Sequence, residues 1–285
     1  MHTLKCPLSC WIAHFYCHKP PVDYYICKEV GLIFQKVRPS TYEMTQYADA
    51  EYEFGLYRDY ARASSLKYET FKRRIQLISR IATGSRLLDV GCSSGFFIEI
   101  ALQHGFDAYG IEISKNAIAL AKEKIRARIT NGDVNLLPER GEKGFDIIVA
   151  FDIIEHTQDP LKFLKNMREI LSPKGWLVLA TPDTGHFLRY LMGCRWPMLQ
   201  PMQHTYLFSK RAMRKALELA GYDQIRIQRG EKRMSLEYLM GQIRIYTPLL
   251  AKAYKVISRL LPITMREKSF SINIGEMLVF CRNGF

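Results

Sequence analysis

Short apolar runs alternate with helix-like segments through the middle of the chain. Five segments have the character of strands, at residues 85–92, 107–113, 127–133, 144–154 and 175–183. The first is rich in Leu and Val, which suits a strand buried on both faces. Apolar residues at helical spacing predict helices at residues 94–105, 114–125 and 159–175. This alternation predicts parallel strands joined by helices, in a sheet that is covered on both faces.

The pattern changes after Asp183. Prolines and aromatic residues at 184–209 predict a functional loop with a short helix, and a helix is expected at 209–222. Two closing strands, at 223–230 and 271–283, flank a basic helical insertion, and one or two further helices are expected at 51–82. The fold class is therefore α/β, a Rossmann-like doubly wound, mostly parallel sheet of seven strands.

The loop after the first strand, in "LLDVGCSSGFF", carries the first candidate site. Ser93 stands where a dinucleotide-binding loop would have its middle glycine, and the Gly-Lys-Ser/Thr of a phosphate-binding loop is absent. Gly91 and Gly95 instead predict a tight turn and a close approach of the backbone to a ligand.

Acidic residues close three strands at the same edge of the predicted sheet. Asp89 ends the first strand, and Glu112 ends the second, where a carboxylate accepts the hydroxyls of a ribose. Asp133 closes the third strand, where it faces the amino edge of an adenine. The edge therefore predicts a nucleoside-binding site.

Five stretches, in this order, resemble motifs of the class I S-adenosylmethionine-dependent methyltransferases: "LLDVGCSSGFF", "GIEIS", "NGDVNLLP", "FDIIVAFDIIEHTQDP" and "LKNMREILSPKGWLVLATPD". The resemblance is continuous over residues 84–183 and implies S-adenosylmethionine as cofactor. The glycines would pass beneath its methionine part, and Ser93 stands where the family commonly has glycine. The cofactor-binding residues implied are Asp89, Gly91, Cys92, Gly95, Glu112, Ile113, Asp133, Val134, Phe151 and Asp152.

Transfer of a methyl group to a hydroxyl needs positioning and a base. His204, in the loop after the fifth strand, is the first catalytic candidate and His156 the second, with a structural role as the alternative for each. Trp196 and Tyr206 are expected to wall the acceptor pocket, with plain packing as the alternative. "RWPMLQPMQHTYLFS" resembles a segment of a bacterial methyltransferase subfamily, of the ubiquinone-biosynthesis type, that often modifies small metabolites, sugars or quinone precursors.

The N-terminal stretch "CPLSC…YYICKEVGLIF" resembles the zinc ribbon that precedes the methyltransferase domain in this subfamily. Cys6, Cys10 and Cys27 match its ligands loosely, and Val30 replaces the last thiolate. We expect a degenerate ribbon that keeps its β-hairpin without metal and predict no metal-ligand residues. The alternative is a zinc ion whose ligand set is completed by His14, Cys17 or His18.

The expected domains are therefore a ribbon-like segment at 1–40, a helical extension at 41–84 and the methyltransferase domain at 85–285. The basic insertion forms a helical lid at about 232–268. Its charges either lie in water or contact a membrane surface that carries a lipid-linked acceptor.

Charge, hydrophobicity and cysteine content indicate where in the cell the protein is expected. The formal net charge is +13, and from Lys210 onward fifteen Lys or Arg face six Asp or Glu. No apolar run reaches the length of a membrane span, the N-terminus lacks the features of a signal peptide, and seven cysteines do not form a disulfide pattern. These features predict a cytoplasmic protein, with peripheral contact at the inner membrane surface as the further alternative.

The sequence therefore predicts a methyltransferase, acting on oxygen of a small-molecule, sugar, quinone-precursor or lipid-linked acceptor. One alternative is an RNA methyltransferase or nucleic-acid binder that uses the basic C-terminal region. This alternative ranks lower, because the Asn-Pro-Pro-Tyr type of motif, which amino-methylating enzymes of nucleic acids carry after the fourth strand, is missing. The other is a non-catalytic subunit that binds S-adenosylmethionine.

Overall fold

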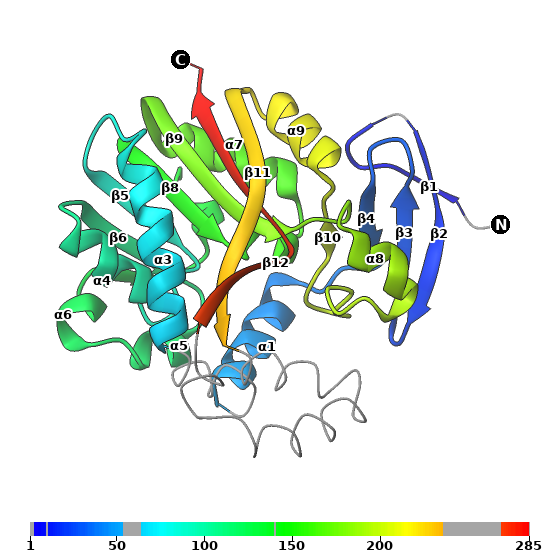
Figure 1. Ribbon diagram of the computed structural model, residues 1–285, viewed down its shortest axis with the longest axis horizontal. Coiled ribbons are helices and arrows are strands. Elements are labelled where there is room, and N and C mark those ends of the chain that lie inside the picture. The colour runs from blue at the N-terminus through cyan, green and yellow to red at the C-terminus, as the bar shows by residue number, and fades with distance from the viewer. Residues whose placement is uncertain (1–2, 10, 54–63, 140, 236–268, 285) are drawn as a thin grey trace.

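The computed structural model describes residues 3–9, 11–53, 64–139, 141–235 and 269–284. Its centre is a seven-stranded sheet in the order β11-β12-β9-β8-β5-β6-β7 (Figure 1). The strands from β7 to β9 pair in parallel, whereas β12 is antiparallel to both β9 and β11. The predicted doubly wound, mostly parallel sheet is confirmed. Its strands are β5 (Arg86–Val90), β6 (Asp107–Glu112), β7 (Ile129–Asn131), β8 (Phe145–Phe151), β9 (Leu171–Pro182), β11 (Tyr222–Ser235) and β12 (Ser269–Asn283).

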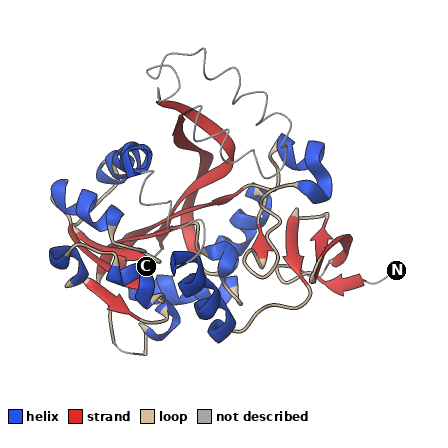
Figure 2. Ribbon diagram, turned by 90° about the horizontal axis from the view of Figure 1, so that it is seen from below, coloured by secondary structure: helices blue, strands red, loops and turns tan. Residues whose placement is uncertain are grey.

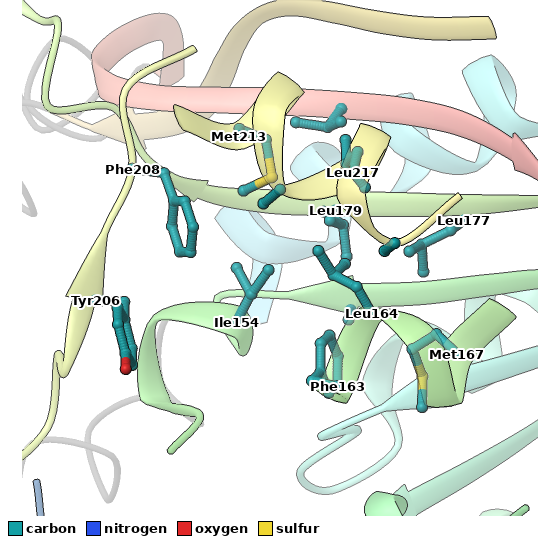
Figure 3. Close-up of a cluster of buried hydrophobic side chains, with 14 of the residues drawn as sticks. Ile154, Phe163, Leu164, Met167, Leu177, Leu179, Tyr206, Phe208, Met213 and Leu217 are labelled. Carbon is teal, nitrogen blue, oxygen red and sulfur yellow. The ribbon is translucent and has the colours of Figure 1, made fainter. Parts of the chain in front are cut away.

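Alternate residues of the central strands enter two cores, one on each face of the sheet. In β5, Leu88 and Val90 belong to one core and Leu87 to the other. Helices α7 (Pro160–Ile170) and α9 (Lys210–Leu219) cover the first face, where their apolar side chains meet those of β9 (Figure 3). Helices α3 (Ser64–Ser79) and α4 (Phe96–Gln103) cover the second face. Burial on both faces is why these strands read as continuous apolar runs.

The other helices are short, apart from α1, which precedes the strands of this sheet in the chain. The helix expected over residues 114–125 is divided into two pieces, and the helix expected to reach Gly175 ends at Ile170. Leu171 already pairs with Phe145, and Pro173 falls in the irregular stretch of this ladder, where its missing N–H costs no regular hydrogen bond. The remaining helical elements are α1 (Thr41–Glu53), α5 (Lys115–Ala119), α6 (Glu123–Arg126), α8 (Phe187–Met192), η1 (Val134–Leu136), η2 (Ile154–His156) and η3 (Gly193–Arg195).

A second, antiparallel sheet stands beside the first (Figure 2). It has five strands: β1 (Thr3–Lys5), β2 (Ile12–Lys19), β3 (Val22–Cys27), β4 (Leu32–Gln35) and β10 (Tyr206–Leu207). Four come from the N-terminal segment, but β10 comes from the loop after β9, and Tyr206 pairs with Phe34. The N-terminal unit is thereby joined to the loop that was expected to hold the acceptor.

Where the structure describes the positions that match the zinc-ribbon ligands, their side chains are packed in the apolar core. Cys6 and Cys27 are buried in the first core together with Val30, while Cys10 lies outside the described residues. His14 and His18 are exposed, and Cys17 belongs to a separate cluster with Trp196. None of the three substitute ligands therefore joins Cys6 and Cys27.

The strand β11 continues to Ser235, so residues 232–235 are strand and not the start of a helical lid. The expected lid at residues 236–268 lies outside the described residues. Among the described helices, none combines the length and apolar character that crossing a membrane requires.

Candidate active site

The loop after β5 turns at two glycines with positive φ, 70° at Gly91 and 72° at Gly95. A Cβ atom on Gly91 would collide with the side chain of Ile153, and one on Gly95 with that of Ile125. Backbone conformation and packing therefore both require glycine at these positions. The backbone N–H of Gly91 donates to the carbonyl of Ile111 at 2.8 Å, which ties the loop to the end of β6.

Ser93 also has a positive φ, 54°, although it is not glycine. Its backbone N–H donates to Glu112 Oε2 at 2.8 Å, and its Oγ accepts from the Tyr52 hydroxyl at 2.7 Å. These two hydrogen bonds hold the serine in a conformation that glycine would adopt without strain. The departure from the family pattern at Ser93 thus leaves the loop geometry intact.

Glu112 lies at the centre of this end of the site. Its Oε1 accepts from the backbone N–H of Ser114 at 2.9 Å, and burial raises the pKa of its carboxyl. Beneath it, burial and then the Glu112 charge raise the pKa of Asp89 well above its usual value. Cys92 is buried as well, and its burial is the main reason why the pKa of its thiol is raised. Asp89 and Cys92 are therefore buried at the start of the loop, whereas Glu112 closes β6 as predicted.

The third strand ends before the acid that was expected to close it. β7 stops at Asn131, and Asp133 caps η1 by accepting from the backbone N–H of Asn135 at 2.9 Å. The Asn131 side chain donates to the carbonyls of Glu112 and of Ile113, each at 3.0 Å. Ile113 and Val134 are both half-buried beside these groups.

Helix α1 contributes residues that the sequence analysis missed. Asp49 accepts a hydrogen bond from Ser114 Oγ at 2.5 Å, Tyr52 reaches Ser93, and Tyr47 bonds to Gln203 (Figure 1 shows α1 beside α5). The tyrosines recur at 42, 47 and 52, a spacing with no regular helical period, so the pattern alone gave no reason to place them at the site.

These residues fit the nucleoside and methionine ends of S-adenosylmethionine. The glycine turns bring backbone to the carboxyl edge of the sheet, where open α/β sheets bind ligands. The Glu112 carboxylate retains lone pairs beyond the two that its backbone partners use, so it can also accept the hydroxyls of a ribose.

At the end of β8, a charged network surrounds Asp152. Lys232 Nζ lies 3.0 Å from Asp152 Oδ2 and 2.9 Å from Glu276 Oε1, and Arg74 lies 2.6 Å from Glu276 Oε2. Burial alone would lower the pKa of Lys232, but its two carboxylate partners outweigh it and raise that pKa. Phe151 is stacked on Phe71, with the Arg74 guanidinium 4.5 Å from the centroid of its ring. Lys232 and Arg74 were not predicted, because they reach the site from β11 and α3.

Next to this network, the two catalytic candidates lie side by side. The ring centroids of His156 and His204 are 4.8 Å apart in an edge-to-face arrangement. Burial lowers the pKa of both imidazoles, for His204 to about 3, with His156 as its second cause. Both rings are therefore neutral at physiological pH and bind a proton weakly.

Glu155, which was not predicted, completes the group. Its side chain is 1% exposed, Thr181 donates to its Oε2 at 2.9 Å, and burial followed by the Asp152 charge raises its pKa to about 8. The signal was available in "DIIEH", which sets Asp152, Glu155 and His156 three and four residues apart, close to one helical turn.

The two aromatic candidates are packed against other side chains. Trp196 is 1% exposed and packs with Cys17, Tyr24 and Leu199, so it is a core residue and not a pocket wall. Tyr206 is stacked between Phe34 and Phe208. His186, in the same loop after β9, caps α8.

Comparisons with known proteins agree with this geometry. The family model described as "Methyltransferase domain" matches residues 57–227, more than half of the 285 residues. The ubiquinone biosynthesis O-methyltransferase of Cereibacter sphaeroides is 29% identical over 134 residues, which cover 45% of this chain and 54% of the relative. That of Coxiella burnetii is 31% identical over 113 residues, covering 38% and 47%. The chain thus spans about half the length of these curated relatives.

Solved structures share the fold at low identity. A SAM-dependent methyltransferase from Archaeoglobus fulgidus has a TM-score of 0.53 at 15% identity and covers 78% of this chain and 98% of its own. Magnesium protoporphyrin IX methyltransferase from Synechocystis, solved with bound SAH, has a TM-score of 0.53 at 12% identity and covers 83% and 98%. With the fold of the class I methyltransferases and a family match over most of its sheet, the chain belongs to the methyltransferase domain family.

Proposed function

We propose that this protein transfers the methyl group of S-adenosylmethionine to an oxygen atom of a small-molecule or lipid-linked acceptor. The acceptor's hydroxyl binds beside Glu155, His156 and His204, and the cofactor lies on the glycine loop and Glu112.

One observation carries the proposal. Gly91, Gly95 and Glu112, which form the nucleoside cradle, lie at the ends of β5 and β6. His156 follows β8 of the same sheet, and the ring of His204 contacts that of His156. Parallel strands present their carboxyl ends at one edge, so a cofactor and an acceptor bound there meet over that edge.

The reaction requires little from the protein beyond the positioning of the cofactor and the acceptor. S-adenosylmethionine supplies an activated methyl group, and the acceptor oxygen attacks the methyl carbon in line and displaces S-adenosylhomocysteine. The C–O bond forms as the S–C bond breaks, the electron pair of the S–C bond stays on sulfur, and the hydroxyl proton passes by way of a histidine to the solvent. His156 and His204 are unprotonated at neutral pH and offer a lone pair to that hydroxyl.

The choice of oxygen draws support from the relatives. Both curated relatives above are named as O-methyltransferases of ubiquinone biosynthesis. A quinone precursor is accordingly one acceptor class to test. Membrane or nucleic-acid contact through the basic insertion rests on sequence alone, because residues 236–268 lie outside the described part of the chain.

Calorimetry with S-adenosylmethionine tests the cofactor half of the proposal. Wild-type protein should bind it with 1:1 stoichiometry, and Glu112→Ala should bind it much more weakly. Glu142→Ala, at an exposed position, is the matched control and should bind like the wild type. Absence of binding, or equal binding by Glu112→Ala, would contradict the proposal.

Tritium transfer from methyl-labelled S-adenosylmethionine tests the acceptor half. Hydroxylated aromatic acids and prenylated hydroquinones are the probes, and the label should appear as a methyl ether. Label found on nitrogen, or in RNA added to the assay, would instead overturn the assignment to oxygen.

A further inference from the structure

A hollow of about 1010 Å³ lies between the start of α7 and the segment that links β4 to α1. Arg38 contributes to one wall, and Lys162 and Lys165 contribute to the other. The volume is of the size that holds a small organic ligand. The described residues that line the hollow include neither His156 nor His204, so it is separate from the proposed reaction site.

Three cations line this hollow without forming an ion pair. Among the ion pairs of the described ranges, none involves Arg38, Lys162 or Lys165. All three residues are exposed, so a ligand in the hollow can reach their charges. Lys162 and Lys165 lie three residues apart, on one face of α7. The charges therefore come from two segments of the chain and lie around one space.

The two acids that line the hollow are used as helix caps. Glu43 Oε2 accepts from the backbone N–H and from the hydroxyl of Ser40, each at 2.7 Å. Asp159 Oδ1 accepts from the backbone N–H groups of the second and third residues of α7, each at 3.0 Å. Each carboxylate thus serves the start of its own helix, and neither forms an ion pair with the three cations.

The position of Lys162 is unfavourable for the stability of α7 alone. It is the third residue of that helix, where the positive end of the helix dipole disfavours a cation and favours an anion. Lysine at this place adds to the positive potential in the hollow. An anion bound there would interact favourably with both the side chain and the helix end.

Two contacts hold the walls of the hollow in place. Gln158 Nε2 donates to the carbonyl of Pro39 at 2.9 Å, which ties the Arg38 segment to the start of α7. The Arg38 guanidinium lies 5.3 Å from the centroid of the Tyr206 ring. Tyr206 is 3% exposed, and its hydroxyl points away from Phe208 (Figure 3). Burial raises the pKa of that hydroxyl, so it keeps its proton and can donate it in a hydrogen bond.

We propose that this hollow binds the phosphate group of a phosphorylated small molecule, of the sugar-phosphate class, between Arg38, Lys162 and Lys165. The guanidinium fork of arginine matches two phosphate oxygens, and the lysine ammonium groups act as point charges. A phosphate monoester carries roughly −1.5 to −2 charges at pH 7, which suits three cations better than the single charge of a carboxylate. The phosphate fills only part of the hollow, and Ser40 and Asn166 line it with polar groups for the hydroxyls of a sugar.

Isothermal titration calorimetry of the full-length protein, in phosphate-free buffer, tests the site with inorganic phosphate and with glucose 6-phosphate. Both should bind once per chain and compete with each other, whereas glucose should not bind. Arg38→Gln and Lys162→Gln should each bind phosphate about 10- to 100-fold more weakly, because each loses a hydrogen bond between charged groups.

Lys124→Gln is the matched control, because it removes the same charge from an exposed lysine of α6 that does not line the hollow. It should bind phosphate like the wild type. Circular dichroism and S-adenosylmethionine calorimetry verify that each variant folds. Phosphate binding that is absent in the wild type, or equally strong in the Arg38 and Lys162 variants, overturns the site.

A lipid headgroup offers the same phosphate chemistry as a soluble molecule. Phosphatidylcholine vesicles with and without phosphatidic acid distinguish these two sources. Vesicle binding that requires phosphatidic acid and is lost in Lys162→Gln, with no binding of glucose 6-phosphate, overturns the assignment to a soluble ligand.

The phosphate site goes beyond the proposed methyl transfer, and the two proposals fail separately. If the protein binds no phosphate yet binds S-adenosylmethionine and forms methyl ethers, the phosphate site is wrong and the proposed function stands. If phosphate binds as expected but S-adenosylmethionine does not, the proposed function is wrong and the phosphate site stands.

Discussion

The backbone N–H of Ser93 donates to Glu112 Oε2 at 2.8 Å, so one hydrogen bond joins the glycine loop of β5 to the end of β6. Because this bond comes from the backbone, it survives a change of the Ser93 side chain. The side chain instead governs the strain of a positive φ and the contact with Tyr52.

Substitutions at Ser93 should separate these two effects. Ser93→Gly relieves roughly 1–2 kcal/mol of left-handed strain and loses a hydrogen bond worth about 1 kcal/mol, so its free energy of unfolding should stay within about 1 kcal/mol of the wild type. Ser93→Ala keeps the strain and loses the bond, and should be destabilised by about 1 kcal/mol. Urea unfolding measures both; an alanine variant as stable as the glycine variant would show that φ is not strained here.

Cofactor affinity should depend on pH through Glu112. Burial raises the pKa of this carboxyl above its usual 4.5, and only the ionised form accepts both hydroxyls of a ribose. Affinity for S-adenosylmethionine should therefore increase as pH rises above 4.5. Glu112→Gln should bind roughly 10- to 100-fold more weakly, the loss of a hydrogen bond to a charged group. Calorimetry across this range would contradict the role of Glu112 if wild type and variant showed the same pH dependence.

Breaking the buried ion pair between Arg74 and Glu276 should destabilise the fold. Both side chains are buried, at 6% and 4% exposure. Without Arg74, the carboxylates of Asp152 and Glu276 share the single charge of Lys232, so one negative charge is uncompensated. Arg74→Leu should lower the free energy of unfolding by roughly 3–5 kcal/mol. The neighbouring Arg73, whose side chain is 57% exposed, offers the control: Arg73→Leu should cost no more than about 1 kcal/mol. Equal effects of the two substitutions in urea unfolding would refute the buried pair.

Stability below pH 7 should depend on His204. Its pKa is lowered from 6.5 to about 3, so the folded state keeps the ring neutral while the unfolded chain takes up a proton. The stabilisation is complete above pH 6.5 and is lost as pH falls, by about 2 kcal/mol between pH 7 and pH 5. Glu155 acts in the opposite direction, because its raised pKa of about 8 favours protonation in the folded state.

The measurement is therefore a difference between two proteins. When the pH falls from 7 to 5, the free energy of unfolding of the wild type should decrease relative to that of His204→Gln by about 2 kcal/mol. Identical pH profiles would mean that His204 titrates normally.

Much of the cofactor side of the site follows from local pattern. Gly91, Gly95 and Glu112 could be assigned from the chain alone because a buried parallel strand, the turn after it and the acid closing the next strand are each encoded over a few consecutive residues. The right-handed crossover rule then brings their ends to one edge without any further information. For the same reason the order of strands and helices could be predicted, apart from their exact ends.

The acceptor side depends on contacts between distant segments. His204 reaches His156 because the adjacent Thr205 donates to the carbonyl of Glu155, and Lys232 reaches Asp152 because β11 extends to Ser235. Trp196 looked like a pocket wall until packing against Cys17 placed it in a core. Local periodicity tells which face of an element is buried but not which element covers it, so these neighbours emerge only when the two sheets pack together.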